Sequence, residues 1–88
     1  MDNEELKDQE IRSIVFDSKG HIWVGTYIAL YRCSRDFSSC KRYDSSLPVT
    51  SVNSIYEDTD HNLWVTFWQK GIFRYDRVKD TFVKYPKL

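Results

Sequence analysis

The side chains that could do chemistry in this 88-residue chain fall in two short turns. One turn holds Asp17 and His21, and the other holds Asp58 and His61. Carboxylates and imidazoles close together are used for general acid–base catalysis or for binding a metal ion. However, neither histidine has a further ligand at the spacing of a zinc site. The sequence also contains no Ser, His and Asp arrangement and no glycine-rich phosphate loop. It therefore predicts no metal site, no cofactor and no enzymatic activity.

These turns belong to a repeat. Residues 17–26 read DSKGHIWVGT and residues 58–67 read DTDHNLWVTF, and the match extends over 11–44 and 52–86 with Lys70 as one inserted residue. A period of about 40 residues is typical of a supersecondary unit used repeatedly. We therefore predict a first unit with its linker over 11–51 and a second unit over 52–88. The acidic segment 1–10 is expected to be a flexible lead-in.

Each unit is predicted to form four short antiparallel strands, because its apolar segments are rich in β-branched and aromatic residues and end in turns. The expected strands are 13–16, 22–26, 30–33 and 40–43 in the first unit and 53–57, 63–68, 72–75 and 81–85 in the second. Gly20 can take a positive φ in the first turn, and Asp60 or Asn62 is expected to do so in the second. The predicted fold class is all-β.

The second strand of each unit indicates how the sheets pack. Its segments IWV and LWV carry apolar residues at consecutive positions, so both faces of the strand are expected to be covered. Four-stranded sheets stacked around an axis, as the blades of a β-propeller, satisfy this pattern. Two blades cannot close a ring, so we expect a fragment of a propeller or a ring completed by oligomerisation. A two-sheet sandwich, which buries one face of each sheet, is the alternative.

The motif D-x-x-G-x-[IL]-W-[VI]-G-T followed by a [GA]-L-Y-R strand resembles the two-component regulator propeller repeat. DSKGHIWVGT and ALYR fit closely, whereas the second copy departs at His61, Thr66 and Phe67. The resemblance implies a non-catalytic part of a periplasmic sensor in a hybrid two-component system. Such a sensor is anchored in the membrane by its parent protein and detects a glycan or another extracellular ligand. A blade pair of a polysaccharide-active propeller enzyme, or a plain interaction scaffold, is the alternative.

Four residues repeat as anchors of the units. Trp23 and Trp64 each offer enough apolar surface to fill the space between two sheets, and stacking on a sugar is the alternative. Asp17 and Asp58 are expected to accept hydrogen bonds from the backbone of their own turns rather than to act in catalysis. All four are therefore predicted to be structural.

Cys33 and Cys40 fall on the third and fourth strands of the first unit, where the second unit has Tyr75 and Phe82. If these strands pair as a hairpin, the two thiols lie opposite each other and could form a disulfide. A periplasmic location would allow such a bond. Two small apolar residues in place of aromatic ones are the alternative.

The segment Phe67, Trp68, Gln69 and Lys70 departs most from its counterpart in the first unit, which contains Tyr27. In a propeller this loop emerges on the same side as the linker between blades, where propellers bind ligands. Exposed aromatic residues beside Gln and Lys suit a carbohydrate or a peptide. We therefore predict a ligand-binding site at these five residues, with packing against an adjacent blade or subunit as the alternative.

Composition restricts the partners. The 13 basic and 13 acidic residues cancel without a basic run, so nucleic acid is not expected as a partner. No stretch approaches the roughly 20 apolar residues of a membrane span, so this segment is not expected to insert into a membrane. Two blades leave an apolar face at each end. We expect the remaining blades of a parent propeller, or further copies of the chain in a homo-oligomer, to cover these faces.

Overall fold

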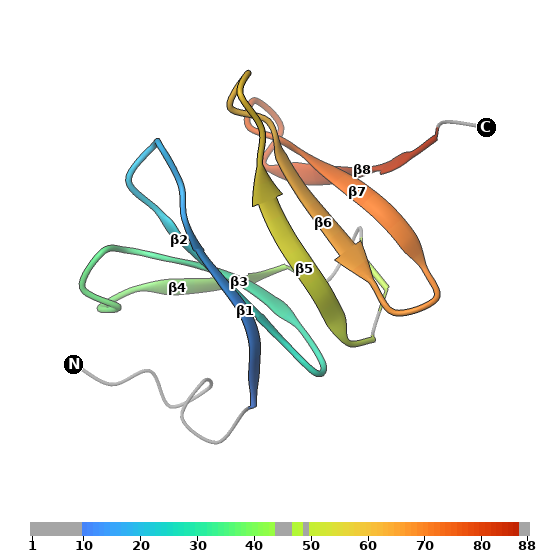
Figure 1. Ribbon diagram of the computed structural model, residues 1–88. Coiled ribbons are helices and arrows are strands. Elements are labelled where there is room, and N and C mark those ends of the chain that lie inside the picture. Colours follow the sequence, from blue (N-terminus) through green and yellow to red (C-terminus); the bar gives the residue numbers. More distant parts are fainter. Residues whose placement is uncertain (1–9, 44–46, 49, 87–88) are drawn as a thin grey trace.

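The computed structural model describes residues 10–43, 47–48 and 50–86, so residues 1–9 of the predicted lead-in lie outside the described part. Eight strands form two sheets, in the orders β1-β2-β3-β4 and β5-β6-β7-β8 (Figure 1). No helix of the described part is long and apolar enough to cross a membrane. The strands are β1 (Ile11–Phe16), β2 (Ile22–Thr26), β3 (Leu30–Cys33), β4 (Cys40–Tyr43), β5 (Val52–Glu57), β6 (Leu63–Phe67), β7 (Gly71–Asp76) and β8 (Thr81–Tyr85).

All eight strands overlap the ranges predicted from the sequence. The differences are at the ends: β1 starts at Ile11, β5 at Val52 and β7 at Gly71, whereas β6 ends at Phe67 and β7 at Asp76. In both sheets every strand pairs antiparallel with the next one along the chain. The predicted all-β class with two four-stranded antiparallel sheets is therefore confirmed.

The centre of the first sheet is buried on both faces, as the sequence pattern of β2 requires. Trp23 and Val24 are neighbours on β2, so they point to opposite faces, and each is 0% exposed. The Trp23 face belongs to the core that spans both sheets. The Val24 face forms a separate cluster with Ile22, Tyr31 and Cys33.

The two sheets contact each other through non-equivalent faces. Trp23 packs in one core with Val65 and Phe73 of the second sheet. Trp64, the counterpart of Trp23, precedes Val65 on β6 and therefore points to the opposite face. A sandwich of two repeats would bring equivalent faces together, whereas successive propeller blades stack head to tail. The arrangement is the head-to-tail one.

Gly25 on β2 determines how closely the sheets approach. A Cβ atom at this position would lie 2.4 Å from Cγ1 of Val52, at the start of β5. Carbon atoms in van der Waals contact are about 3.5–4 Å apart, so no larger residue fits without a shift of the strands. The Gly of the Trp-Val-Gly-Thr motif thus allows β5 to pack directly on β2.

Two expectations from the sequence are wrong. Trp64 is only partly buried, unlike Trp23, because the described residues include no third sheet to cover its face. In the second turn His61, and neither Asp60 nor Asn62, takes the positive φ of 65°. The His61 ring lies 3.1 Å from the hydroxyl of Ser18 in the first sheet, and this contact helps to hold the turn.

Candidate functional site

An aspartate closes the turn between the first two strands of each sheet. The Oδ1 atom of Asp17 accepts hydrogen bonds from the backbone N–H groups of Lys19 and His21, both at 2.9 Å. The Oδ2 atom accepts one from the indole N–H of Trp23 at 2.7 Å. Asp58 makes the same three bonds in the second turn. One carboxylate therefore fixes both the turn and the tryptophan that follows it.

Neither aspartate is suited to acid–base catalysis. Burial raises the pKa of Asp17, but the hydrogen bonds from His21 and Trp23 outweigh it and leave the pKa below its ordinary value. The pKa of Asp58 is also lowered, first by the hydrogen bond from Trp64. A general acid or base works best with a pKa near the operating pH. Both carboxylates are instead ionised acceptors whose oxygens are already engaged.

Asp80, in the turn between β7 and β8, joins the two sheets. Its carboxylate accepts hydrogen bonds from the hydroxyls of Tyr43 and Tyr75 and forms ion pairs with Arg32 and Lys41. Arg32 also donates to the Tyr75 hydroxyl at 2.8 Å. Burial raises the pKa of Asp80, but the bonds from Lys41, Tyr43 and Tyr75 outweigh it and lower the pKa far below its ordinary value. This junction cluster connects three residues of the first sheet to two of the second.

A serine, a histidine and a glutamate also meet between the sheets. Ser18 Oγ donates to Glu57 Oε2 at 2.6 Å and lies 3.1 Å from Nδ1 of His61. Glu57 Oε2 lies 3.6 Å from the same Nδ1 atom. In a hydrolase triad the serine contacts one ring nitrogen and the carboxylate contacts the other. Here both contact Nδ1, so the cluster links the sheets without the geometry of a nucleophile.

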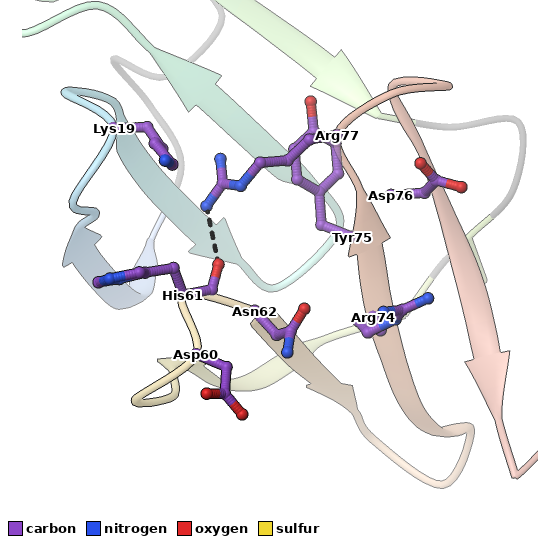
Figure 2. A pocket seen from close by; sticks show the side chains of 8 residues that line it. All are labelled: Lys19, Asp60, His61, Asn62, Arg74, Tyr75, Asp76 and Arg77. Atoms are coloured by element: carbon purple, nitrogen blue, oxygen red, sulfur yellow. Dashed lines mark hydrogen bonds between the residues drawn. The ribbon is translucent and has the colours of Figure 1, made fainter.

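A pocket of about 370 Å³ opens beside this cluster, between the β1–β2 turn, the β5–β6 turn and the end of β7 (Figure 2). Its charged side chains comprise three bases and two acids: Lys19, Arg74, Arg77, Asp60 and Asp76. Arg77 also donates to the backbone carbonyl of His61 at 3.3 Å. Within the described residues, no group of His, Cys, Asp or Glu side chains could hold a metal ion. The mixed charges of the pocket select neither an anion nor a cation.

Of the predicted ligand residues, Tyr27 lies in the β2–β3 loop, Phe67 ends β6, and the other three form the β6–β7 turn. The loop and the turn are both at the lower end of the molecule in Figure 1. Trp68 is 57% exposed, and Gln69 and Lys70 beside it are exposed as well. The backbone N–H of Trp68 donates to the carbonyl of Ser51 at 2.9 Å, so this turn does lie beside the end of the linker. Trp68 is thus an accessible aromatic surface at this end.

Phe67 and Tyr27, unlike Trp68, do not offer a freely accessible aromatic ring. Phe67 is 3% exposed and packs against Phe73, so the expectation of an exposed aromatic residue is wrong at this position. The cause is the alternation of β6, which places Phe67 on the same face as the buried Val65. Tyr27 is 45% exposed, but Arg12 donates to its hydroxyl at 3.1 Å and covers its ring.

Cys33 and Cys40 are joined by a disulfide between β3 and β4. The two residues are opposite each other in the register, with Cα atoms 4.0 Å apart. The disulfide lies on the face of the first sheet that points away from the second, where Phe37 packs against it. In the second sheet the equivalent positions are Tyr75 and Phe82, which face the first sheet.

Sequence reasoning missed the junction cluster. Its only signal in the sequence is the repetition of two residues, because Arg32 aligns with Arg74 and Tyr43 with Tyr85. Their acceptor Asp80 aligns with Ser38, so the repeat does not reveal it. Contacts between different residues of successive units cannot be found from the residues that the units share.

Comparisons with known proteins agree with this fold. The family described as two component regulator propeller matches residues 5–27 and 46–69, more than half of the chain. No curated protein matches the chain. Among solved structures, one described as the extracellular domain of the hybrid two component system BT4673 from B. thetaiotaomicron is 28% identical, with a TM-score of 0.78 over 88% of this chain.

A second structure, described as the extracellular domain of the one component system BT4673 from the same organism, is 27% identical, with a TM-score of 0.79 over 88% of this chain. This chain spans only 11% of either of those domains. The family match and the structural similarity both indicate a propeller, and the head-to-tail stacking of the two sheets agrees with that architecture. The chain belongs to the two component regulator propeller family, and its sheets are two blades of a β-propeller.

Proposed function

We propose that the chain supplies two blades of the extracellular sensor propeller of a hybrid two-component regulator and has no catalytic role. The observation that carries this proposal is the similarity of 88% of the chain to the extracellular domain of BT4673. Because the chain spans 11% of that domain, the parent protein is expected to supply the remaining blades, the membrane anchor and the signalling output.

The geometry described above supports the non-catalytic role. Asp17 and Asp58 are engaged by their own turns, and Ser18 and Glu57 approach the same nitrogen of His61. The charged groups of these sites are therefore used to hold turns and sheets together.

A location in the periplasm is supported by the disulfide between Cys33 and Cys40, because disulfides persist in oxidising compartments and are rare in the cytosol. The test is to quench cells that express the parent protein with acid and to label free thiols with a polyethylene-glycol maleimide. We expect Cys33 and Cys40 to be labelled only after reduction. Labelling of both thiols without reduction would contradict the proposed location.

For the ligand we propose a carbohydrate at the β6–β7 turn, because the exposed ring of Trp68 offers an aromatic face beside the polar side chains of Gln69 and Lys70. Maltohexaose, cellohexaose and chitohexaose serve as probes in fluorescence titrations of the whole extracellular domain. Trp68→Ala should abolish binding of the oligosaccharide that binds. Val78→Ala is the control, because Val78 is an apolar residue that is 95% exposed in a different turn, between β7 and β8. Binding that survives Trp68→Ala, or no binding of any probe, would refute the carbohydrate site.

A further inference from the structure

We infer that the outer face of the second sheet, defined by Trp64, Thr66, Arg74 and Tyr85, docks a blade that differs from both blades of this chain. The docking blade presents a tyrosine, an aspartate and a glycine at three defined positions. The inference rests on the proposed function only in taking the chain to be part of a larger propeller.

The contact between the two sheets is the template for this docking. On the face of the first sheet, Arg32 lies over the ring of Tyr43 with 5.9 Å between the guanidinium carbon and the ring centre. In the second sheet, the Tyr75 hydroxyl accepts a hydrogen bond from Arg32 at 2.8 Å, and the Asp80 carboxylate forms an ion pair with Arg32 at 3.4 Å. A stacked arginine and tyrosine on one blade are thus met by a tyrosine and an aspartate on the next.

The outer face of the second sheet repeats the first half of this arrangement. Arg74 pairs with Trp64 across β6 and β7, as Arg32 pairs with Trp23 across β2 and β3. The guanidinium of Arg74 lies 5.4 Å from the ring centre of Tyr85. Its Nε atom is buried and has no hydrogen-bond partner among the described residues. In the template contact it is the Nη1 atom of Arg32 that reaches Tyr75 and Asp80 of the next blade. The equivalent end of the Arg74 guanidinium therefore suits an incoming tyrosine hydroxyl and aspartate carboxylate.

Thr66 adds a steric condition. It occupies the position of Gly25, the glycine that lets Val52 of the next blade approach. Because Thr66 has a side chain where Gly25 has none, an incoming blade cannot carry valine at the position of Val52. Glycine is needed there, because alanine would keep the Cβ atom, which in the template lies 2.7 Å from a Cβ at position 25.

A second copy of this chain fails all three conditions. The first sheet would be the one to dock, and it has Ile11, Cys33 and Ser38 at the positions of Val52, Tyr75 and Asp80. Cys33 is held in a disulfide and offers no hydroxyl, and Ser38 offers no charge. The complementarity therefore favours another blade of the parent propeller over the homo-oligomer considered from the sequence.

The experiment lengthens the chain by one blade. Residues 44–88 are repeated after Tyr85, the counterpart of Tyr43, with Val52→Gly in the added copy. The matched control adds residues 44–51 and 11–43 at the same place, with Ile11→Gly in the added copy. Both additions bring a four-stranded unit, but only the first brings a tyrosine and an aspartate to Arg74. Hydrogen exchange of the Trp64 indole N–H, followed by NMR, reports whether the outer face is covered.

We expect the first addition to slow exchange of the Trp64 indole N–H at least tenfold and Arg74→Ala to remove this protection. The control addition should leave the exchange rate close to that of the original chain. Equal protection by both additions, or protection that survives Arg74→Ala, would overturn the inference. These outcomes do not depend on whether the chain is periplasmic or binds a carbohydrate. They can therefore fail independently of the thiol-labelling and oligosaccharide experiments that test the proposed function.

The recognition rule is also testable in the original chain. Arg32→Ala, Asp80→Ala and the double variant form a cycle at the existing junction. Arg32 and Asp80 share a charge-assisted hydrogen bond, so the effects of the two substitutions should not be additive. The unfolding equilibrium constant of the double variant should differ about tenfold from the value expected for independent effects. Additive effects would overturn the rule from which the docking blade is inferred, whatever the lengthened chains show.

Discussion

Replacing Gly25 by alanine should weaken the contact between the two blades. The added Cβ atom would lie 2.4 Å from Cγ1 and 2.7 Å from Cβ of Val52. Because one of these atoms is the Cβ of Val52 itself, a rotation of the valine side chain cannot remove the clash. The strands must move apart, and such overpacking typically costs about 1–3 kcal/mol. We expect a loss of that size in the free energy of unfolding.

Urea unfolding followed by tryptophan fluorescence measures the loss. Gly20→Ala is the control, because Gly20 also has no side chain but a Cβ atom there would meet nothing within 4 Å. Its cost comes only from the positive φ of 88°, which disfavours alanine by roughly 1–2 kcal/mol. The two variants thus separate backbone strain from a clash between blades.

Val52→Gly completes the test, because it removes the atoms that alanine at position 25 would meet. The combined Gly25→Ala and Val52→Gly variant should be more stable than the sum of the two losses predicts, by at least about 1 kcal/mol. Gly20→Ala should show no such coupling with Val52→Gly. Effects of Gly25→Ala and Val52→Gly that add within about 0.5 kcal/mol would contradict direct packing of Val52 on Gly25.

Three further predictions concern the polar contacts. Asp17→Ala should lower the free energy of unfolding by about 1–3 kcal/mol in urea titrations, because it leaves the buried indole N–H of Trp23 without its acceptor. An unchanged free energy of unfolding would show that the hydrogen bond between Asp17 and Trp23 does not stabilise the fold. Asp80 should make stability depend on pH: its folded pKa is lowered, so its contribution is present above the unfolded pKa of about 3.9 and is lost as the pH falls through the folded pKa. Asp80→Asn should therefore lose less stability than the original chain between about pH 5 and about pH 2, and an identical loss would contradict this role. Reduction of the disulfide between Cys33 and Cys40, which are seven positions apart, should lower the midpoint of thermal unfolding. The free energy of unfolding should fall by about 2.5 kcal/mol, because the unfolded chain gains loop entropy. The stability of a Cys33→Ser, Cys40→Ser variant should not respond to the reductant.

The strands and their packing could be predicted because both repeats in the sequence show the same pattern of apolar residues and turns. Trp23 and Val24 are adjacent apolar residues on one strand, which requires cover on both faces, and the structure provides it. Cys33 and Cys40 were expected to lie opposite each other if the third and fourth strands pair as a hairpin, and β3 and β4 do pair in this register.

The errors arise where the two units differ in their surroundings. Trp64 repeats Trp23 in the sequence, but burial depends on a neighbouring sheet, which a repeat cannot reveal. Phe67 was predicted to be exposed from its place near a loop, whereas the alternation of β6 places it in the core. Asp80 could not be found because it contacts residues of the other unit, between 37 and 48 positions away along the chain.

The head-to-tail stacking of the two sheets is the central claim, and nuclear Overhauser contacts of the tryptophan rings in the 88-residue chain test it most directly. The account predicts contacts from Trp23 to Tyr75 and Phe82, whose ring centres lie 4.8 Å and 5.8 Å from the indole. Trp64 should show contacts to Tyr85, at 5.3 Å, within its own sheet. Contacts between Trp23 and Trp64, which a sandwich of equivalent faces would produce, would contradict the account.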